Sequence, residues 1–245
     1  MILNSVLLTA ALAAGDGSFA ERLNAALAAD IRTEADTARD ANRQPLATLE
    51  FFGVSSDQKV LELVPGRGWY TKVLAPAIDD FHISIGGTWV IDNLISEKGY
   101  DHINVIEPQG MEMARSAEFN LRTINGPFSF GETGFDVILT FRNLHNFDEA
   151  GRRHLNAAVF DALAPGGVYG VVDHTRRHME PITSENRRRA DPVEMIKEIQ
   201  DAGLVLEDYT ALHYKPGDEL TLEVGNDAVT GRTDRFTFKF RKPAN

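Results

Sequence analysis

The sequence predicts an α/β fold built on a mostly parallel sheet with helices on both of its faces. Residues 59–64 form an almost continuous apolar run that ends in a Pro-Gly-Arg-Gly turn, as expected for a strand buried on both faces of a parallel sheet. Two more strand-like runs, 135–141 and 167–173, are separated by a helical pattern over 149–163. Strand, helix and strand in this order are typical of a doubly wound sheet.

The chain begins with an apolar stretch, residues 1–14, which is too short to span a bilayer and ends in small residues. We expect it to be a secretory signal peptide, although no Lys or Arg precedes Arg22, or else an apolar N-terminal helix. The first alternative makes the protein periplasmic or secreted, and the second leaves it in the cytoplasm. Residues 19–50 follow as a helical region rich in Ala and charge, interrupted at Pro45.

The remaining elements follow from hydrophobic periodicity and from turn residues. In the helix over 149–163, Leu155, Val159 and Leu163 recur every four residues and define one apolar face. Residues 235–241 alternate phenylalanine with polar residues, which predicts a final, antiparallel strand with one wetter face. Further strands are expected over 81–87, 89–92, 103–106 and 204–212, and further helices over 70–75 and, with Asp191 as its N-cap, 192–202.

Composition narrows the class of protein. With 43% hydrophobic and 25% charged residues, the chain of 245 residues is expected to be a soluble, globular protein without an integral membrane segment. Its net charge is −11, because 36 Asp and Glu outnumber 25 Lys and Arg, so nucleic acid is not an expected partner. There is no cysteine, which excludes disulfides, thiolate nucleophiles and cysteine-ligated metal centres.

The turn after residues 59–64 is a candidate ligand site. Gly66 and Gly68 lie between a strand and a helix, where backbone N–H groups bind nucleotide-like ligands or where glycine serves only to reverse the chain. A dinucleotide site has a third small residue where this chain has Thr71, so pyrophosphate fits poorly. S-adenosylmethionine fits better, because Glu62 precedes the turn and a buried carboxylate needs a partner, unless it accepts N–H bonds from the glycine loop itself.

Together with motifs further along the chain, these residues resemble class I S-adenosylmethionine-dependent methyltransferases, and more narrowly a bacterial family of predicted methyltransferases that often carry export signals. The motifs occur in order at 36–45, 51–53, 60–71, 74–76, 140–147, 163–168, 172–174 and 231–236. The resemblance implies a Rossmann-like fold with a mostly parallel seven-stranded sheet and an antiparallel final strand. It makes 51–245 the methyltransferase domain and 19–50 a lid over the cofactor cleft, in which Arg39 or Arg43 meets a carboxylate.

The resemblance also implies where S-adenosylmethionine binds. The cofactor-binding residues that it implies are Glu62, Gly66, Gly68, Trp69, Tyr70, Arg142 and Asn143. Those up to Tyr70 lie at the methionine end and its edge, and the segment 142–146 faces the sulfonium. Two departures from the class are visible: Val64 stands where a glycine is usual, and no acidic residue ends the second strand to hold the ribose. Asp92 or Glu107 is expected to take that role.

Three polar residues at the ends of predicted strands are candidates for catalysis. Methyl transfer mainly requires orientation of the acceptor, but a histidine can remove a proton from a hydroxyl or amine acceptor. His145 follows the strand over 135–141 at the edge where open α/β sheets bind ligands; alternatively, it caps the next helix or bonds a neighbouring asparagine. Asp173 and His174 end the following strand, and Asp173 either orients His174 through an N–H bond or stabilises a turn.

No metal site is expected. His174 and His178 have the spacing of two ligands on one helix face, but the residues around them suggest a loop. Residues 187–189, three consecutive arginines, are expected to form a solvated face rather than a cluster that attracts an acidic substrate.

The predicted function is the transfer of a methyl group from S-adenosylmethionine to a small-molecule acceptor. A protein of the same fold that binds S-adenosylmethionine without turnover is the first alternative. A nicotinamide-dependent oxidoreductase is the second, and Thr71 together with the missing acidic ribose ligand disfavours it.

Overall fold

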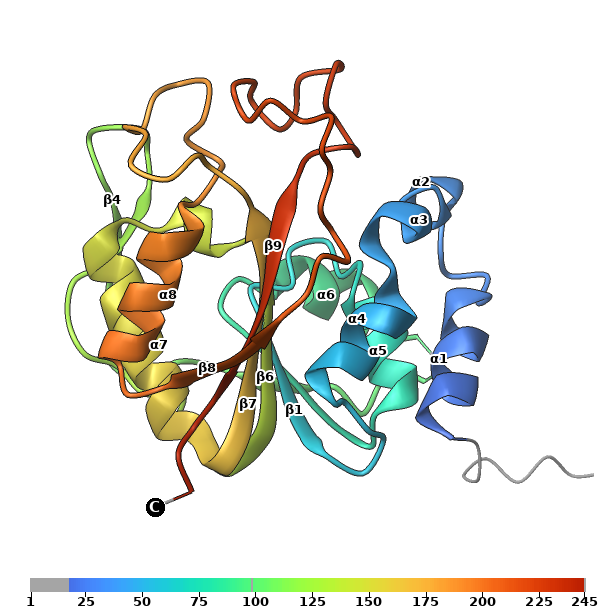
Figure 1. Cartoon of the computed structure of the whole chain (residues 1–245). Coiled ribbons are helices and arrows are strands. Elements are labelled where there is room, and N and C mark those ends of the chain that lie inside the picture. Colours follow the sequence, from blue (N-terminus) through green and yellow to red (C-terminus); the bar gives the residue numbers. More distant parts are fainter. Residues whose placement is uncertain (1–17, 98, 245) are drawn as a thin grey trace, which may run out of the picture.

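The computed structural model describes residues 18–97 and 99–244, and it has a seven-stranded sheet at its centre (Figure 1). The apolar stretch 1–14, predicted as a signal peptide or an N-terminal helix, lies outside the described residues. Within the described ranges, no helix has the length and the apolar character that crossing a bilayer requires.

The strands of the central sheet follow the order β3-β2-β1-β6-β7-β9-β8. They are β1 (Lys59–Leu63), β2 (Asp80–Ser84), β3 (Asn104–Ile106), β6 (Phe135–Phe141), β7 (Leu163–His174), β8 (Val205–Tyr209) and β9 (Arg235–Arg241). Neighbouring strands are parallel except at β9, which is antiparallel to both β7 and β8. The predicted Rossmann-like fold with a mostly parallel sheet and an antiparallel final strand is therefore confirmed. A separate antiparallel pair is formed by β4 (Met113–Arg115) and β5 (Arg122–Ile124).

Helices lie on both sides of the sheet (Figure 1). On one side, α7 (Glu149–Ala162) and α8 (Pro192–Asp201) contact each other, and apolar side chains such as Leu155 and Ile199 join one buried cluster. Leu23 and Leu49 belong to a second cluster on the other side. The remaining helices are α1 (Phe19–Leu27), α2 (Glu34–Thr37), α3 (Asp40–Arg43), α4 (Pro45–Phe52), α5 (Thr71–Leu74) and α6 (Thr88–Asn93), with 3-10 turns η1 (Ala75–Ala77) and η2 (Leu144–Asn146).

An aspartate caps the N-terminus of each helix on the first side. Asp148 accepts a hydrogen bond from the backbone N–H of Gly151, and Asp191 accepts one from Val193, as predicted for the helix that begins at Pro192. These side chains satisfy N–H groups that have no partner within the helix.

The strand predicted over residues 89–92 is wrong, because these residues belong to α6. A short apolar run does not distinguish a strand from one turn of a helix. The structure shows that Val90 and Leu94, four residues apart, lie on one face, where both approach Gly68. The strand expected over 81–87 also ends early, at Ser84, because the next two residues, Ile85 and Gly86, take positive φ values of 63° and 76°.

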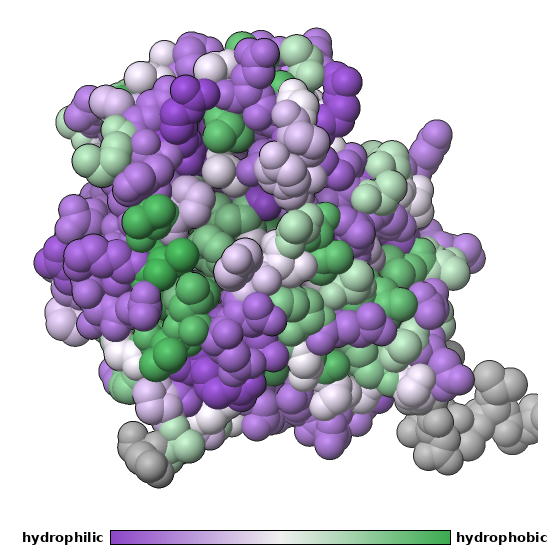
Figure 2. All heavy atoms as spheres, in the orientation of Figure 1, coloured by the Kyte–Doolittle hydropathy of each residue, from purple (hydrophilic) through white to green (hydrophobic). Residues whose placement is uncertain are grey.

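The carboxyl ends of the parallel strands meet at one edge of the sheet, drawn at the top of Figure 1. The segments 175–191 and 210–234 lie above this edge, with α2 and α3 beside them. Figure 2 shows mainly hydrophilic residues over these upper segments and hydrophobic residues exposed lower, around α8 and β8. Ligands of open α/β sheets bind at such a carboxyl edge.

Candidate functional site

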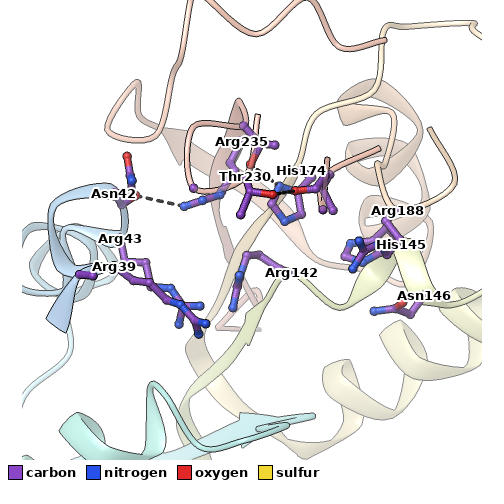
Figure 3. A pocket seen from close by; sticks show the side chains of 15 residues that line it. Arg39, Asn42, Arg43, Arg142, His145, Asn146, His174, Arg188, Thr230 and Arg235 are labelled. Carbon is purple, nitrogen blue, oxygen red and sulfur yellow. Dashed lines mark hydrogen bonds between the residues drawn. The ribbon is translucent and has the colours of Figure 1, made fainter. Parts of the chain in front are cut away.

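A cavity of about 470 Å³ opens at the carboxyl edge, between α3 and the ends of β6, β7 and β9 (Figure 3). All the ionisable side chains of its lining are arginines or histidines, and they come from segments far apart in the sequence. The charged and imidazole side chains that line it are Arg39, Arg43, Arg142, His145, His174, Arg188 and Arg235.

His145 and Asp173 form a buried pair beside this cavity. His145 lies in η2, just after β6, and its Nδ1 is 2.6 Å from Oδ1 of Asp173, near the end of β7. The backbone N–H of His145 also donates to Oδ2 of Asp173 at 3.0 Å. Because an ionised carboxylate only accepts hydrogen bonds, this geometry places the proton on Nδ1 and leaves Nε2 free to accept another.

His174 lies next to this pair but has different partners. Its ring contacts the hydroxyl of Thr233 through Nδ1 at 3.0 Å, and its centroid is 5.7 Å from that of His145. The predicted N–H bond from the His174 ring to Asp173 is wrong, because His174 donates to Asp173 through its backbone N–H, at 2.7 Å, and not through its ring. Successive strand residues point to opposite faces. Burial, and then the adjacent His145, lower the pKa of His174 well below its usual value, so its ring stays neutral.

Glu62 is buried near the end of β1 and contacts Thr71, the first residue of α5, which follows the glycine turn. Thr71 donates its hydroxyl to Oε2 of Glu62 at 2.6 Å. Burial raises the pKa of Glu62 to about 7, although the hydrogen bond from Thr71 and the nearby charge of Arg43 act in the opposite direction. A cationic ligand bound beside this buried carboxylate would stabilise its ionised form.

The two glycines of the turn have different surroundings. Gly66 has a φ of 60° and no atom within 4 Å of the position that a Cβ would occupy, so backbone here is open to a ligand. Gly68 has a φ of 66°, but a Cβ there would lie 2.9 Å from Leu94 and 3.1 Å from Val90. The side of the turn at Gly68 is therefore filled by side chains around α6.

Trp69 and Tyr70 are buried against the helical region that precedes the sheet. The indole N–H of Trp69 donates to the carbonyl of Asp36 at 3.0 Å, and the guanidinium of Arg43 lies 4.1 Å from the Trp69 ring centre. Tyr70 stacks on Phe141 with ring centres 3.5 Å apart. These aromatic residues hold the predicted lid region against the edge of the sheet.

Asn143 connects the ends of two strands. Its Nδ2 donates to the carbonyls of Leu63 and Val64 at 3.3 and 3.2 Å. Asp92 is exposed on α6, and Glu107 is exposed just after β3; neither of these two predicted ribose ligands lines the cavity.

Three central strands each end in a strained residue. Val64 after β1, Ile85 after β2 and Arg142 after β6 have φ values of 53°, 63° and 62°. This left-handed region is unfavourable for residues with a Cβ and especially for β-branched ones. Backbone strain of this kind concentrates at functional sites, and all three residues lie at the carboxyl edge.

The cavity brings together only part of the predicted site. Arg142, His145 and His174 line it, whereas Glu62 and the glycine turn lie outside its lining. Sequence reasoning missed Arg235, Asn42 and Thr230 as lining residues. The motif at 231–236 was the available signal for Arg235 and the motif at 36–45 for Asn42, whereas Thr230 lies outside both.

The expectation that residues 187–189 form a solvated face is wrong. Arg188 lines the cavity and pairs with Glu223. Arg189 is fully buried and pairs with Asp218 at 2.8 Å.

The alternative of a metal site has no support in the described part of the chain. Nδ1 of His178 lies 2.9 Å from Oδ2 of Asp191, whereas the ring of His174 contacts Thr233, so the two histidines have different partners. No group of three or more potential metal ligands occurs among the described residues.

The residues at the turn fit the amino-acid end of S-adenosylmethionine. Glu62 offers a buried carboxylate for its ammonium group, Gly66 offers open backbone, and Arg43 lies close enough to influence the pKa of Glu62. The end of β2 fits the ribose less well, because Ser84 already donates its hydroxyl to the carbonyl of Ile106 at 2.8 Å and carries no charge.

Comparison with known proteins agrees with the fold. No protein-family model matches the chain. An uncharacterised methyltransferase of Synechocystis sp. is 30% identical over 125 residues, which is 51% of this chain and 51% of the relative. The chain thus matches about half the length of this curated relative.

Solved structures share the architecture at low sequence identity. A SAM-dependent methyltransferase from Aquifex aeolicus has a TM-score of 0.55 at 14% identity, covering 83% of this chain and 92% of that one. The glycopeptide N-methyltransferase MtfA in complex with sinefungin has a TM-score of 0.54 at 15% identity, covering 83% and 94%. The [4+2]-cyclase SpnF has a TM-score of 0.56 at 15% identity, covering 83% and 81%. The chain therefore has a fold like that of SAM-dependent methyltransferases.

Proposed function

We propose that this protein transfers a methyl group from S-adenosylmethionine to a small-molecule acceptor and that His145 removes the acceptor's proton. The observation that carries the proposal is the 2.6 Å contact between His145 and the buried Asp173 at the wall of the cavity. A histidine oriented by a carboxylate is an effective general base near neutral pH.

The fold supports the choice of cofactor. One structural neighbour, MtfA, was solved with sinefungin, an analogue of S-adenosylmethionine. In this chain Glu62, Gly66 and Arg43 would hold the methionine end of the cofactor. When bound, S-adenosylmethionine supplies a methyl group activated by positively charged sulfur.

The chain's own residues orient the acceptor and take its proton. Asp173 holds the Nδ1–H of His145, so Nε2 accepts the proton of a hydroxyl or amine acceptor. The positive charge that then forms on His145 is stabilised by the fully buried Asp173. His174 lines the same wall in its neutral form and is available to accept or donate a hydrogen bond to the acceptor.

A protein that binds S-adenosylmethionine without turnover is the second candidate. It is favoured by the end of β2, where Ser84 and Ile85 provide no carboxylate for the ribose. One neighbour with this architecture, SpnF, is named a [4+2]-cyclase, which illustrates that fold alone does not define the reaction.

Isothermal titration with S-adenosylmethionine and S-adenosylhomocysteine tests cofactor binding. Absence of heat at ~1 mM ligand contradicts the proposal, because cofactor-dependent enzymes bind more tightly than that. Release of S-adenosylhomocysteine across a panel of acceptors then separates turnover from binding alone.

Substitution tests the base. His145→Gln is expected to lower the rate by about 10²- to 10⁴-fold, the usual contribution of a general base. His154→Gln, on α7 and outside the cavity lining, is the matched control and should leave the rate unchanged. Equal rates for His145→Gln and wild type would show that the acceptor loses its proton without this histidine.

A further inference from the structure

The cavity concentrates positive charge in an acidic protein. Arg39, Arg43, Arg142, Arg188 and Arg235 line it, and its described lining contains no Asp or Glu. The chain as a whole carries a net charge of −11. The local charge is thus opposite in sign to the average, and it attracts anions into the cavity.

Buried arginines elsewhere in the described chain have carboxylate partners. These pairs are Arg32 with Asp40, Arg152 with Glu198, Arg176 with Glu194 and Arg189 with Asp218. Within the described residues, Arg43, Arg142 and Arg235 have no carboxylate within 4.0 Å. Nη1 of Arg43, Nε of Arg142 and Nε of Arg235 are buried without a hydrogen-bond partner.

These unpaired arginines are unfavourable in the absence of an anion. Arg43 is 3% exposed and Arg235 is 6% exposed. Burial, followed by repulsion between the neighbouring guanidinium groups, lowers the pKa of Arg43 to about 8 and that of Arg142 to about 10. Stacking of Arg43 on Trp69 offsets only part of the loss of hydration. An oxyanion in the cavity would supply the missing hydrogen bonds and charge.

The arginines come from different elements and extend toward the same space. Figure 3 shows Arg43 from α3 and Arg142 from the end of β6 reaching into the cavity, with Arg235 above them and His145 on the opposite side. Arg235 is held by a hydrogen bond from Nη1 to the carbonyl of Asn42 at 3.0 Å. A ligand bound by these groups lies next to His145, the proposed base.

The cofactor alone does not balance this charge. The methionine end of S-adenosylmethionine carries one carboxylate, and that charge is accompanied by an ammonium and a sulfonium group. One carboxylate pairs with one guanidinium in a bidentate contact, which leaves the other arginines unpaired. The charge of Asp173 favours the charged forms of Arg142 and Arg235, but among the described residues no carboxylate forms a salt bridge with either arginine, so a second anionic ligand would supply the missing contacts.

We propose that the methyl acceptor is a small oxyanion with at least two negative charges, on carboxylate or phosphate groups, and that Arg142 and Arg235 bind it, while Arg43 pairs with the carboxylate of the cofactor. The identity of this anion as the acceptor rests on the proposed function, whereas the anion site itself does not. Guanidinium groups recognise both carboxylate and phosphate oxygens, so the shared chemistry is that of a dianion.

Titration with small anions in the absence of cofactor tests the site. Succinate and inorganic phosphate are the probes, and succinamide at the same ionic strength is the neutral control. We expect one or both anions to raise the melting temperature and to give binding heat, whereas succinamide does neither. If neither anion binds more tightly than succinamide, the proposal is overturned. Stronger binding of succinate than of phosphate assigns a dicarboxylate, and the reverse order assigns a phosphate ester.

Variants link the binding to the arginines. Arg142→Gln and Arg235→Gln are each expected to weaken anion binding by about tenfold or more, the factor for one lost charge-assisted contact. Arg153→Gln, on the exposed face of α7, is the matched control and should bind as the wild type does. Unchanged binding in both cavity variants would overturn the assignment.

Stability without ligand separates a binding role from a structural one. Because Arg142 has an unpartnered buried Nε, its replacement by Gln should leave the ligand-free protein at least as stable as the wild type while removing the anion-dependent rise in melting temperature. A lower melting temperature of the ligand-free variant, with the anion-dependent rise retained, would show that Arg142 serves the fold instead.

Competition with S-adenosylhomocysteine separates this inference from the proposed function. Simultaneous binding of succinate and S-adenosylhomocysteine supports an acceptor site distinct from the cofactor site. Mutually exclusive binding would show that the arginines hold the cofactor's carboxylate, which overturns the inference and leaves the methyltransferase proposal intact. Binding of succinate without binding of S-adenosylhomocysteine supports the anion site and contradicts methyl transfer.

Discussion

Replacing Glu62 with Gln is expected to stabilise the protein at neutral pH and to weaken its binding of S-adenosylmethionine. Glu62 is 3% exposed at the end of β1, and the hydroxyl of Thr71 donates to its Oε2 at 2.6 Å. Gln has nearly the same shape, and its carbonyl oxygen accepts the same hydrogen bond. The substitution therefore removes the charge and changes little else.

The magnitude follows from the difference in pKa between the folded and unfolded states. Burial raises the pKa of Glu62 from 4.5 to about 7 in the folded protein. Between these pH values the folded state retains a proton that the unfolded state has lost, so the free energy of unfolding falls as the pH rises. The fall amounts to about 3 kcal/mol in total, because one pKa unit corresponds to about 1.4 kcal/mol.

Urea unfolding at pH values below and above this window measures the effect. The Glu62→Gln protein should match the wild type at about pH 4 and be more stable by about 3 kcal/mol at about pH 8. Glu118→Gln, at an exposed position, is the control and should show no such pH-dependent gain. A variant less stable than the wild type at about pH 8 would refute the reasoning, because it would mean that the buried carboxylate is well compensated without a ligand. Isothermal titration should show weaker binding of S-adenosylmethionine to the same variant.

Two further predictions test the edge of the sheet by substitution. Asp173→Asn should lower the free energy of unfolding by about 2 kcal/mol in urea, because the buried carboxylate accepts three N–H bonds; unchanged stability would contradict this. Gly68→Ala should lower the free energy of unfolding by about 1–3 kcal/mol more than Gly66→Ala does, and it should therefore melt at the lower temperature. Both positions have a positive φ, but a Cβ at Gly68 would lie 2.9 Å from a leucine side chain.

Strands buried on both faces were predictable because their sequence pattern is local. β1 and β6 are mainly apolar runs interrupted by few polar residues, and β9 alternates phenylalanine with polar residues, so each gives a clear signal. The run at 89–92 gave the same signal and was assigned incorrectly. Its helical state depends on packing of Val90 and Leu94 against Gly68, a contact between segments that the local pattern does not contain.

The partner of Asp173 was not predictable from adjacency in the sequence. His174 follows Asp173, but the alternation of side chains along a strand directs the two residues to opposite faces. His145 reaches Asp173 because β6 and β7 are parallel neighbours whose register pairs Phe141 with Val172. Polar residues near the carboxyl ends of two adjacent parallel strands, His145 just after β6 and Asp173 near the end of β7, were the signal that was available.

The arginine cluster required the tertiary structure. Arg43, Arg142 and Arg235 lie on α3, after β6 and at the start of β9, and no pattern within one segment connects them. Composition argued against such a cluster, since the chain has an excess of 11 negative charges. Net charge describes the whole surface, whereas binding depends on the few charges that converge on one cavity.

Two buried side chains of opposite charge, each without an ion-pair partner among the described residues, lie close together at the carboxyl edge. Glu62 is a buried carboxylate without a cationic hydrogen-bond partner, and Arg43 is a buried guanidinium without an anionic one. Arg43 lowers the pKa of Glu62, yet the two do not form a salt bridge, because Arg43 is held on the ring of Trp69. A bound amino-acid group carrying both an ammonium and a carboxylate would compensate both residues at once, and a dianionic second ligand would compensate Arg142 and Arg235. Burial of these charged side chains without counter-ions costs free energy. The same arrangement therefore favours binding of two ligands of defined charge.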